Sequence, residues 1–118
     1  MKRYTKPAGC KDARERGRVI LAHGEVTGHA HEVLAADTDV DVEVPPMDFF
    51  DEPSGRRVLL VTRPCSLRHE EHAPIALDPK APTQVRQGDV LLNPIGPGAW
   101  EVIRQREFSA EQARQVAD

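Results

Sequence analysis

The chain has 118 residues and a mass of 13.1 kDa, which excludes a two-domain enzyme and predicts a single hydrophobic core. Hydrophobic residues make up 39% of it and charged residues 30%, with 10 prolines, so we expect a modest core beneath a loop-rich surface. The formal net charge is −3, and the chain holds neither an apolar run long enough for a membrane span nor an apolar secretory segment, so its expected location is the cytoplasm, with no membrane partner.

Residues 1–17 are predicted to form a basic arm ahead of a single β domain at residues 18–118. Seven Lys or Arg residues and two acidic residues fall within residues 1–18, whereas residues 32–52 hold eight acidic residues and no Lys or Arg. The arm is expected to be a solvated tail or to fold back onto that acidic stretch. Nucleic-acid binding is the less favoured alternative, because Tyr4 is the arm's only aromatic residue and no helix-turn-helix or zinc-finger pattern follows it.

Alternating apolar and polar residues predict a chain that is mostly β-strand. The sequence Glu-Pro-Ser-Gly at residues 52–55 predicts a hairpin turn between strands at 47–50 and 57–61. A short C-terminal helix is expected over residues 110–116, capped by Ser109. Because no long helices are available for parallel crossovers, the predicted fold class is all-β, a small antiparallel barrel or sandwich with that helix at its end. The strands predicted from alternation are 18–22, 32–35, 39–44, 57–62, 84–86, 89–92 and 100–108.

The five histidines fall in two short segments, and the first segment holds three of them. On a strand, His29 and His31 project from the same face, with about 7 Å between their α-carbons. Gly28 and Gly24 permit a bulge or a close backbone approach that would aim the pair into one cavity. Two imidazoles can converge on one ion from there, and His23 is the weakest candidate of the three.

The second segment holds His69 and His72, separated by Glu70 and Glu71. Histidines three residues apart face opposite sides of a straight strand, so both can join one site only if the two glutamates lie in a turn or bulge. The spacing is not that of the zincin motif, in which the histidines are four residues apart on a helix. The simpler alternative is a solvated, salt-bridged turn beside an ordinary half-buried histidine pair.

These positions lead to the hypothesis of a divalent transition-metal site. Neutral imidazole suits Zn, Fe, Ni or Cu, and carboxylates extend that range to Mn. Three protein ligands and an open position would allow Lewis-acid activation of water or of a substrate whose identity is unknown. The predicted site residues are His29, His31, His69 and His72 as metal ligands, with Glu70 and Glu71 as the nearest catalytic bases.

Three blocks of the sequence resemble a family of short, uncharacterised proteins found in bacteria and their phages. The blocks are GEVTGHAH at residues 24–31, LRHEEHAPI at 67–75 and VIRQREF at 102–108. No activity is assigned to this family, so the resemblance implies none for this chain. Its members have a Gln-Gly-Asp-Val segment near the start, whereas that segment comes after the histidines here, at residues 87–90, which leaves the strand order open.

A weaker resemblance is to the cupins, which are metal-binding β-barrels with an HxH pair and a later Glu and His as ligands. Gly88, Pro94 and Gly96 fit the spacing of the second cupin motif, but Ala99 stands where that motif has its histidine. The glutamate expected after the HxH pair is also absent. The resemblance therefore implies a cupin-like barrel whose remaining ligands come from the second histidine segment.

The predicted function is that of a small metal-binding β-barrel protein using a histidine cluster, with a metal-dependent enzyme as one form of it. The alternative is a non-catalytic structural or interaction module, such as a phage-associated accessory protein, that forms homo-oligomers through strand edges. Four protein ligands without water would favour this alternative, because closed sites are structural. Cys10 and Cys65 have no CxxC partner and are predicted to be free thiols.

Overall fold

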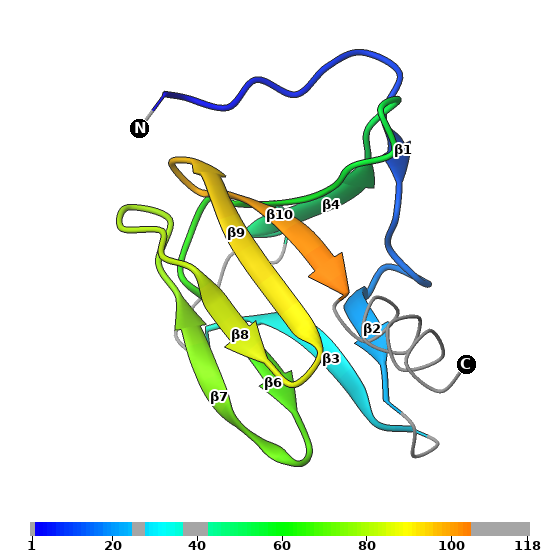
Figure 1. The fold of residues 1–118 in the computed structure, drawn as a ribbon, viewed down its shortest axis with the longest axis vertical. Coiled ribbons are helices and arrows are strands. Elements are labelled where there is room, and N and C mark those ends of the chain that lie inside the picture. Colours follow the sequence, from blue (N-terminus) through cyan, green and yellow to red (C-terminus); the bar gives the residue numbers. More distant parts are fainter. Residues whose placement is uncertain (1, 25–27, 37–42, 105–118) are drawn as a thin grey trace, which may run out of the picture.

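The computed structural model describes residues 2–24, 28–36 and 43–104, which form ten strands in two antiparallel sheets (Figure 1). No helix lies in this part of the chain. The six-stranded sheet, in spatial order, contains β1 (Lys11–Asp12), β4 (Met47–Asp51), β5 (Arg57–Val61), β10 (Ala99–Arg104), β9 (Val90–Gly96) and β8 (Val85–Gln87). The four-stranded sheet contains β2 (Val19–His23), β3 (Ala30–Ala35), β6 (Cys65–His69) and β7 (His72–Leu77).

The chain alternates between the sheets, returning after each hairpin or strand group to the other one. β2 and β3 pair in the small sheet, β4 and β5 in the large one, β6 and β7 in the small one, and β8 to β10 in the large one. Each sheet is open and has two edges: within the described residues, β1 and β8 are the edge strands of the large sheet, and β2 and β7 are those of the small sheet. The expected closed or cupin-like barrel is therefore wrong, and the sandwich alternative describes the two open sheets.

One hydrophobic core fills the space between the sheets. In the longer strands, period-two alternation turns an apolar face inward, and the fully buried side chains come from both sheets. Trp100 is the largest of them, and its indole N–H donates to the backbone carbonyl of Thr83 at 2.9 Å. The core side chains include Val19, Leu21, Val33, Leu67 and Leu77 from the small sheet, and Phe49, Leu59, Val61, Val90, Leu92, Trp100 and Val102 from the large one.

The N-terminal residues pass across one end of the molecule (Figure 1), and contacts of Tyr4 and Lys6 place them against the outer face of the large sheet. Phe50 and Val58 are ladder partners on that outer face and are 1% and 0% exposed. The ring of Tyr4 lies 6.5 Å from that of Phe50, and the ammonium of Lys6 lies 4.3 Å above the same ring. Lys6 also pairs with Asp48 at 3.0 Å, which joins the arm to the acidic stretch.

The hairpin predicted around residues 52–55 is confirmed, because β4 and β5 pair on either side of it. Three strands of the structure, β1, β6 and β7, were not predicted, and β4 was predicted from the hairpin turn rather than from alternation. The predicted strand at 39–44 falls mostly outside the described residues, and its last two residues form a bend rather than a strand. The end of the last predicted strand, residues 105–108, and the predicted helix at 110–116 also lie outside the described residues.

Candidate metal centre

The second histidine segment forms a two-residue hairpin turn. β6 ends at His69 and β7 begins at His72, these two residues are ladder partners, and Glu70 and Glu71 form the turn between them. Directly opposed residues of an antiparallel pair project from the same face of the sheet. The two ring centroids are 4.8 Å apart. The structure thus contains the turn on which a shared site for both histidines depends.

β3 brings the first histidine segment alongside. Glu32 is the ladder partner of Arg68, so the same antiparallel register places His31 opposite His69. The centroids of these two rings are 4.3 Å apart, and the His31 ring lies 5.7 Å from that of His72. His31, His69 and His72 therefore form a row across β3, β6 and β7.

His29 precedes β3 and joins the row from the side. Its ring meets that of His69 edge to face, with 5.8 Å between the centroids. Gly24 permits this approach, because a Cβ at that position would lie 3.1 Å from the Cβ of His29 and 3.3 Å from Nε2 of His69. The four histidines predicted as ligands therefore lie together, although they come from distant segments of the chain.

His23 lies apart from this cluster. Its side chain is 63% exposed, and its Nε2 lies 2.9 Å from Oε1 of Glu15. The residue was the weakest of the sequence candidates, and its surroundings are those of a surface ion pair. It therefore serves as an internal comparison for the other four histidines.

Three side chains of the cluster are close enough to share an ion. His29, His69 and Glu70 each offer one ligand atom, and these atoms all lie within 4.8 Å of one another. Two donors on one tetrahedral zinc lie about 3.4 Å apart, because zinc–nitrogen bonds are about 2.1 Å long. An ion would therefore draw the donors together by about 1 Å, and the exposed side chain of Glu70 has the freedom to follow.

The charge states of these groups suit metal binding. The pKa of Glu70 is lowered, chiefly by a hydrogen bond from its own backbone N–H and further by that of Ala30, so its side chain is an ionised carboxylate. The pKa of His69 is also lowered, because burial penalises the charged ring and because His31 and His72 would repel a positive charge. Ionised carboxylate and neutral imidazole are the forms that bind metal ions.

Glu71 orients the neighbouring rings. Its backbone N–H donates to Nδ1 of His69 at 3.0 Å, and its Oε1 lies 3.4 Å from Nδ1 of His29. Because Nδ1 of His69 accepts this bond, the neutral ring carries its proton on Nε2. A metal ion binds Nδ1 only after this hydrogen bond breaks. It binds Nε2 only after the proton moves to Nδ1, which also breaks the hydrogen bond. Both glutamates predicted as bases thus contact the cluster itself: Glu70 is among the possible ligands and Glu71 is beside them. A catalytic role for either stays a prediction.

The large sheet supplies two contacts to His31 that the sequence did not indicate. Nδ1 of His31 lies 2.9 Å from Oε1 of Gln87, and its Nε2 lies 3.3 Å from Oδ1 of Asp89. Both partners flank Gly88 in the turn between β8 and β9. Gly88 has φ +59°, the sign required at the first central position of a type II′ hairpin turn. The Gln-Gly-Asp segment was visible in the sequence, but nothing in its spacing places it against a histidine of the other sheet.

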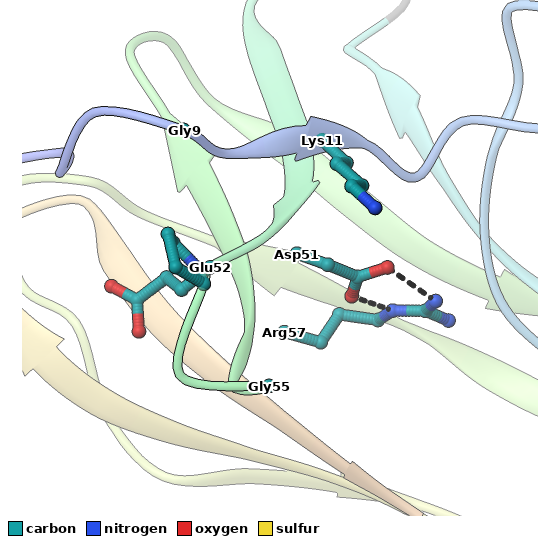
Figure 2. A pocket seen from close by; sticks show the side chains of 7 residues that line it. Gly9, Lys11, Asp51, Glu52, Gly55 and Arg57 are labelled. Atoms are coloured by element: carbon teal, nitrogen blue, oxygen red, sulfur yellow. Dashed lines mark hydrogen bonds and ion pairs between the residues drawn. The ribbon is translucent and has the colours of Figure 1, made fainter.

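A second hollow lies away from the histidines, between the N-terminal arm and the β4–β5 turn (Figure 2). Two of its charged groups are already paired: Nε and Nη2 of Arg57 donate to the two carboxylate oxygens of Asp51 at 2.7 and 3.0 Å. Figure 2 shows Lys11 of β1 beside this pair. The hollow has a volume of about 490 Å³, and its ion pair serves to join the strands β4 and β5.

The fold and the cluster together define a small all-β protein with a histidine-rich candidate metal centre. Residues 2–79 match the family described as a domain of unknown function (DUF8820), and because this match spans more than half of the chain, the protein belongs to that family. The expectation of an uncharacterised family is confirmed to that extent. The matched segment contains the four clustered histidines and both turn glutamates, but not the turn that holds Gln87 and Asp89.

The comparison with curated proteins found no match, and neither did the comparison with solved structures. Within the part of the chain that the structure describes, no helix is both long enough and apolar enough to cross a membrane.

Proposed function

We propose that this protein binds a divalent transition-metal ion at the histidine cluster, with His29, His69 and Glu70 as ligands. The observation that carries the proposal is the proximity of one donor atom from each, all within 4.8 Å of one another, from segments about forty residues apart. Two imidazoles and one carboxylate suit zinc, iron, nickel or manganese. The other two histidines of the cluster, His31 and His72, lie beside His69, with ring centroids 4.3 and 4.8 Å from that of His69.

The proposed site is open to solvent, which favours an exchangeable or catalytic ion over a closed structural one. A groove of about 240 Å³ lies beside His69 and Glu70, and is further lined by Ala30, Glu32 and Leu34 among others. Three protein ligands leave at least one coordination position for water or a small molecule. An ion there would supply Lewis-acid activation of that ligand.

A structural role is the second candidate, and one contact favours it. The backbone N–H of Ala30 donates to Oε2 of Glu70 at 3.3 Å, so the β6–β7 turn is already attached to the start of β3. An ion shared by His29 and Glu70 would strengthen that attachment. Both candidates require the same metal site and differ in whether the ion keeps an open position.

Calorimetric titration of the full chain with Zn²⁺, after removal of metal by a chelator and without a polyhistidine tag, tests the proposal. We expect stoichiometric binding, and we expect His29→Ala to lose one equivalent because it removes a ligand. His23→Ala is the matched control, since it removes a surface histidine outside the cluster. Equal binding by His29→Ala and the unchanged protein would reject the site.

A further inference from the structure

Gln87 determines which nitrogen of His31 carries the proton. The amide nitrogen of Gln87 donates to the backbone carbonyls of Leu67 and Ala73, both at 3.2 Å. Both of its hydrogens are therefore committed, and its oxygen faces Nδ1 of His31 at 2.9 Å. The hydrogen of this bond must come from the ring, so neutral His31 is protonated on Nδ1. Its Nε2 then presents a lone pair on the opposite side.

That lone pair faces a carboxylate. Nε2 of His31 lies 3.3 Å from Oδ1 of Asp89, and the His31 side chain is only 4% exposed. Nε2 of neutral His31 and Oδ1 of ionised Asp89 are both hydrogen-bond acceptors. Two acceptors this close together, with little water around them, require a positively charged species between them. The second carboxylate oxygen, Oδ2, is buried and has no hydrogen-bond partner in the described part of the chain. Within the described residues, no donor therefore compensates the charge on Oδ2, and the Asp89 side chain as a whole is only 21% exposed.

The spacing of these atoms matches that of two ligands on one ion. Donors bound to a tetrahedral divalent cation lie about 3.4 Å apart, and Nε2 of His31 and Oδ1 of Asp89 are 3.3 Å apart. A carbonyl oxygen that accepts from the distal N–H of a ligating histidine is the usual support for such a ligand. Gln87 provides that support for His31.

His72 supplies a third donor beside the same turn. An idealised Cβ on Gly88 would lie 3.2 Å from Nε2 of His72 and 3.4 Å from Nε2 of His31. The two nitrogens thus border a common space that exists because residue 88 has no side chain. His72 is exposed, so its ring can reorient toward an ion at little cost.

We propose that His31, His72 and Asp89 form a second subsite for a divalent transition-metal ion, so that the cluster binds two ions per chain. This inference rests on the proposed function, since it extends the same histidine cluster, but it uses a separate set of ligands. Two imidazoles and one carboxylate select the same class of metal as the first subsite. His69 lies between the subsites, with its ring 5.8 Å from that of His29 and 4.3 Å from that of His31.

Titration of the metal-free full chain with Co²⁺ and Zn²⁺, followed by visible absorption and elemental analysis, tests this subsite. We expect two equivalents for the unchanged protein, one for Asp89→Asn, one for His29→Ala, and none for the double variant. An asparagine amide can donate to Nε2 of His31, so Asp89→Asn is expected to keep the fold. His72→Ala provides an independent test, because it removes an exposed ligand, and it should also lose one equivalent.

The controls and the remaining outcomes separate this inference from the proposed function. Asp48→Asn is the matched control, because it removes a carboxylate from β4 of the same sheet, outside the histidine cluster, where Asp48 pairs with Lys6. If the unchanged protein binds one equivalent, and His29→Ala abolishes this binding whereas Asp89→Asn does not, the second subsite alone is overturned. A proton would then bridge His31 and Asp89. If the unchanged protein binds one equivalent, and both His29→Ala and Asp89→Asn abolish this binding, the cluster holds a single shared site. That result would also overturn the second subsite. No binding by the unchanged protein would overturn both proposals.

Discussion

At the scale of single residues, Gln87 is the group on which the position of His31 depends. It is 3% exposed, and its side chain makes three hydrogen bonds within the described residues, one to the His31 ring and two to backbone carbonyls of the small sheet. A side chain of the large sheet thus completes the hydrogen bonding of β6 and β7. Because the site is buried, no water can replace these bonds without rearrangement.

We expect Gln87→Ala to lower the free energy of unfolding by about 2–3 kcal/mol, because it leaves buried polar groups unpaired and creates a cavity. Gln84→Ala is the matched control: Gln84 is exposed, and within the described residues its side chain donates to that of Asn93 at 2.7 Å. We expect a change within about 0.5 kcal/mol there. Urea unfolding followed by circular dichroism measures both, and similar losses in the two variants would contradict the role given to Gln87.

At the scale of elements, the β8–β9 turn requires glycine for two separate reasons. Gly88 has φ +59°, and a Cβ there would lie 3.1 Å from Cε1 of His31. Gly55 in the β4–β5 turn has φ +92°, but a Cβ there meets no atom within 4 Å. Replacing either glycine with alanine would therefore strain the backbone, but only the replacement of Gly88 would also cause a steric clash.

We therefore expect Gly55→Ala to lower the free energy of unfolding by about 1 kcal/mol and Gly88→Ala by at least 2 kcal/mol. Only Gly88→Ala should weaken metal binding, because its methyl group displaces the rings of His31 and His72. Thermal unfolding and Zn²⁺ titration of both variants check these expectations. Intact binding in a folded Gly88→Ala protein would show that the space beside this turn is not part of the site.

Local sequence patterns predict some of these elements and not others, for identifiable reasons. The β4–β5 hairpin has turn chemistry between two apolar runs, so it can be predicted. β7 contains Pro74, which lacks a backbone donor and normally argues against a strand, but β7 is an edge strand, where proline is tolerated. The proline accounts for the missed β7. It does not account for β6, in which buried Cys65 and Leu67 alternate with more exposed polar residues, so that strand could have been predicted.

The candidate site, like the fold, could be predicted from the sequence only in part. Clustering in the sequence, together with the spacing of residues on a strand, favours His29, His31, His69 and His72 over His23, and the structure brings these four together. The contact of His31 with Asp89 crosses from one sheet to the other, and its partners are 58 residues apart in the sequence. Such contacts depend on how the sheets pack, which residue spacing along the chain does not encode.

At the scale of the whole molecule, Glu52 connects the N-terminal arm to the large sheet. The hydroxyl of Tyr4 donates to its Oε2 at 2.5 Å, and Nε of Arg56 donates to its Oε1 at 2.6 Å. Glu52 is 7% exposed, so these donors largely replace water around its carboxylate. The bonds from Arg56 and Tyr4 lower the pKa of Glu52 to about 2, whereas burial and the nearby carboxylate raise the pKa of Tyr4.

This arrangement predicts a loss of stability in acid. The pKa of Glu52 is lower in the folded protein than its ordinary value of 4.5, so the stabilisation is fully present above about pH 4.5 and is lost as the pH falls towards 2. The Arg56 side chain is 37% exposed, so water screens part of the interaction, and we expect a contribution of about 2 kcal/mol. Glu52→Gln should lower stability at pH 7 and flatten the acid limb of the profile.

Tyr4→Phe distinguishes the contribution of the arm from that of the hairpin. It removes one donor to Glu52 while keeping the ring that covers Phe50, so we expect a loss of about 1 kcal/mol at pH 7 and a shallower decline in acid than in the unchanged protein. Chemical unfolding at a series of pH values between 2 and 7 measures both quantities. An acid limb identical to that of the unchanged protein would mean that Arg56 alone sets the pKa of Glu52. In that case the arm would cover the sheet through its apolar contacts without contributing to the pH dependence.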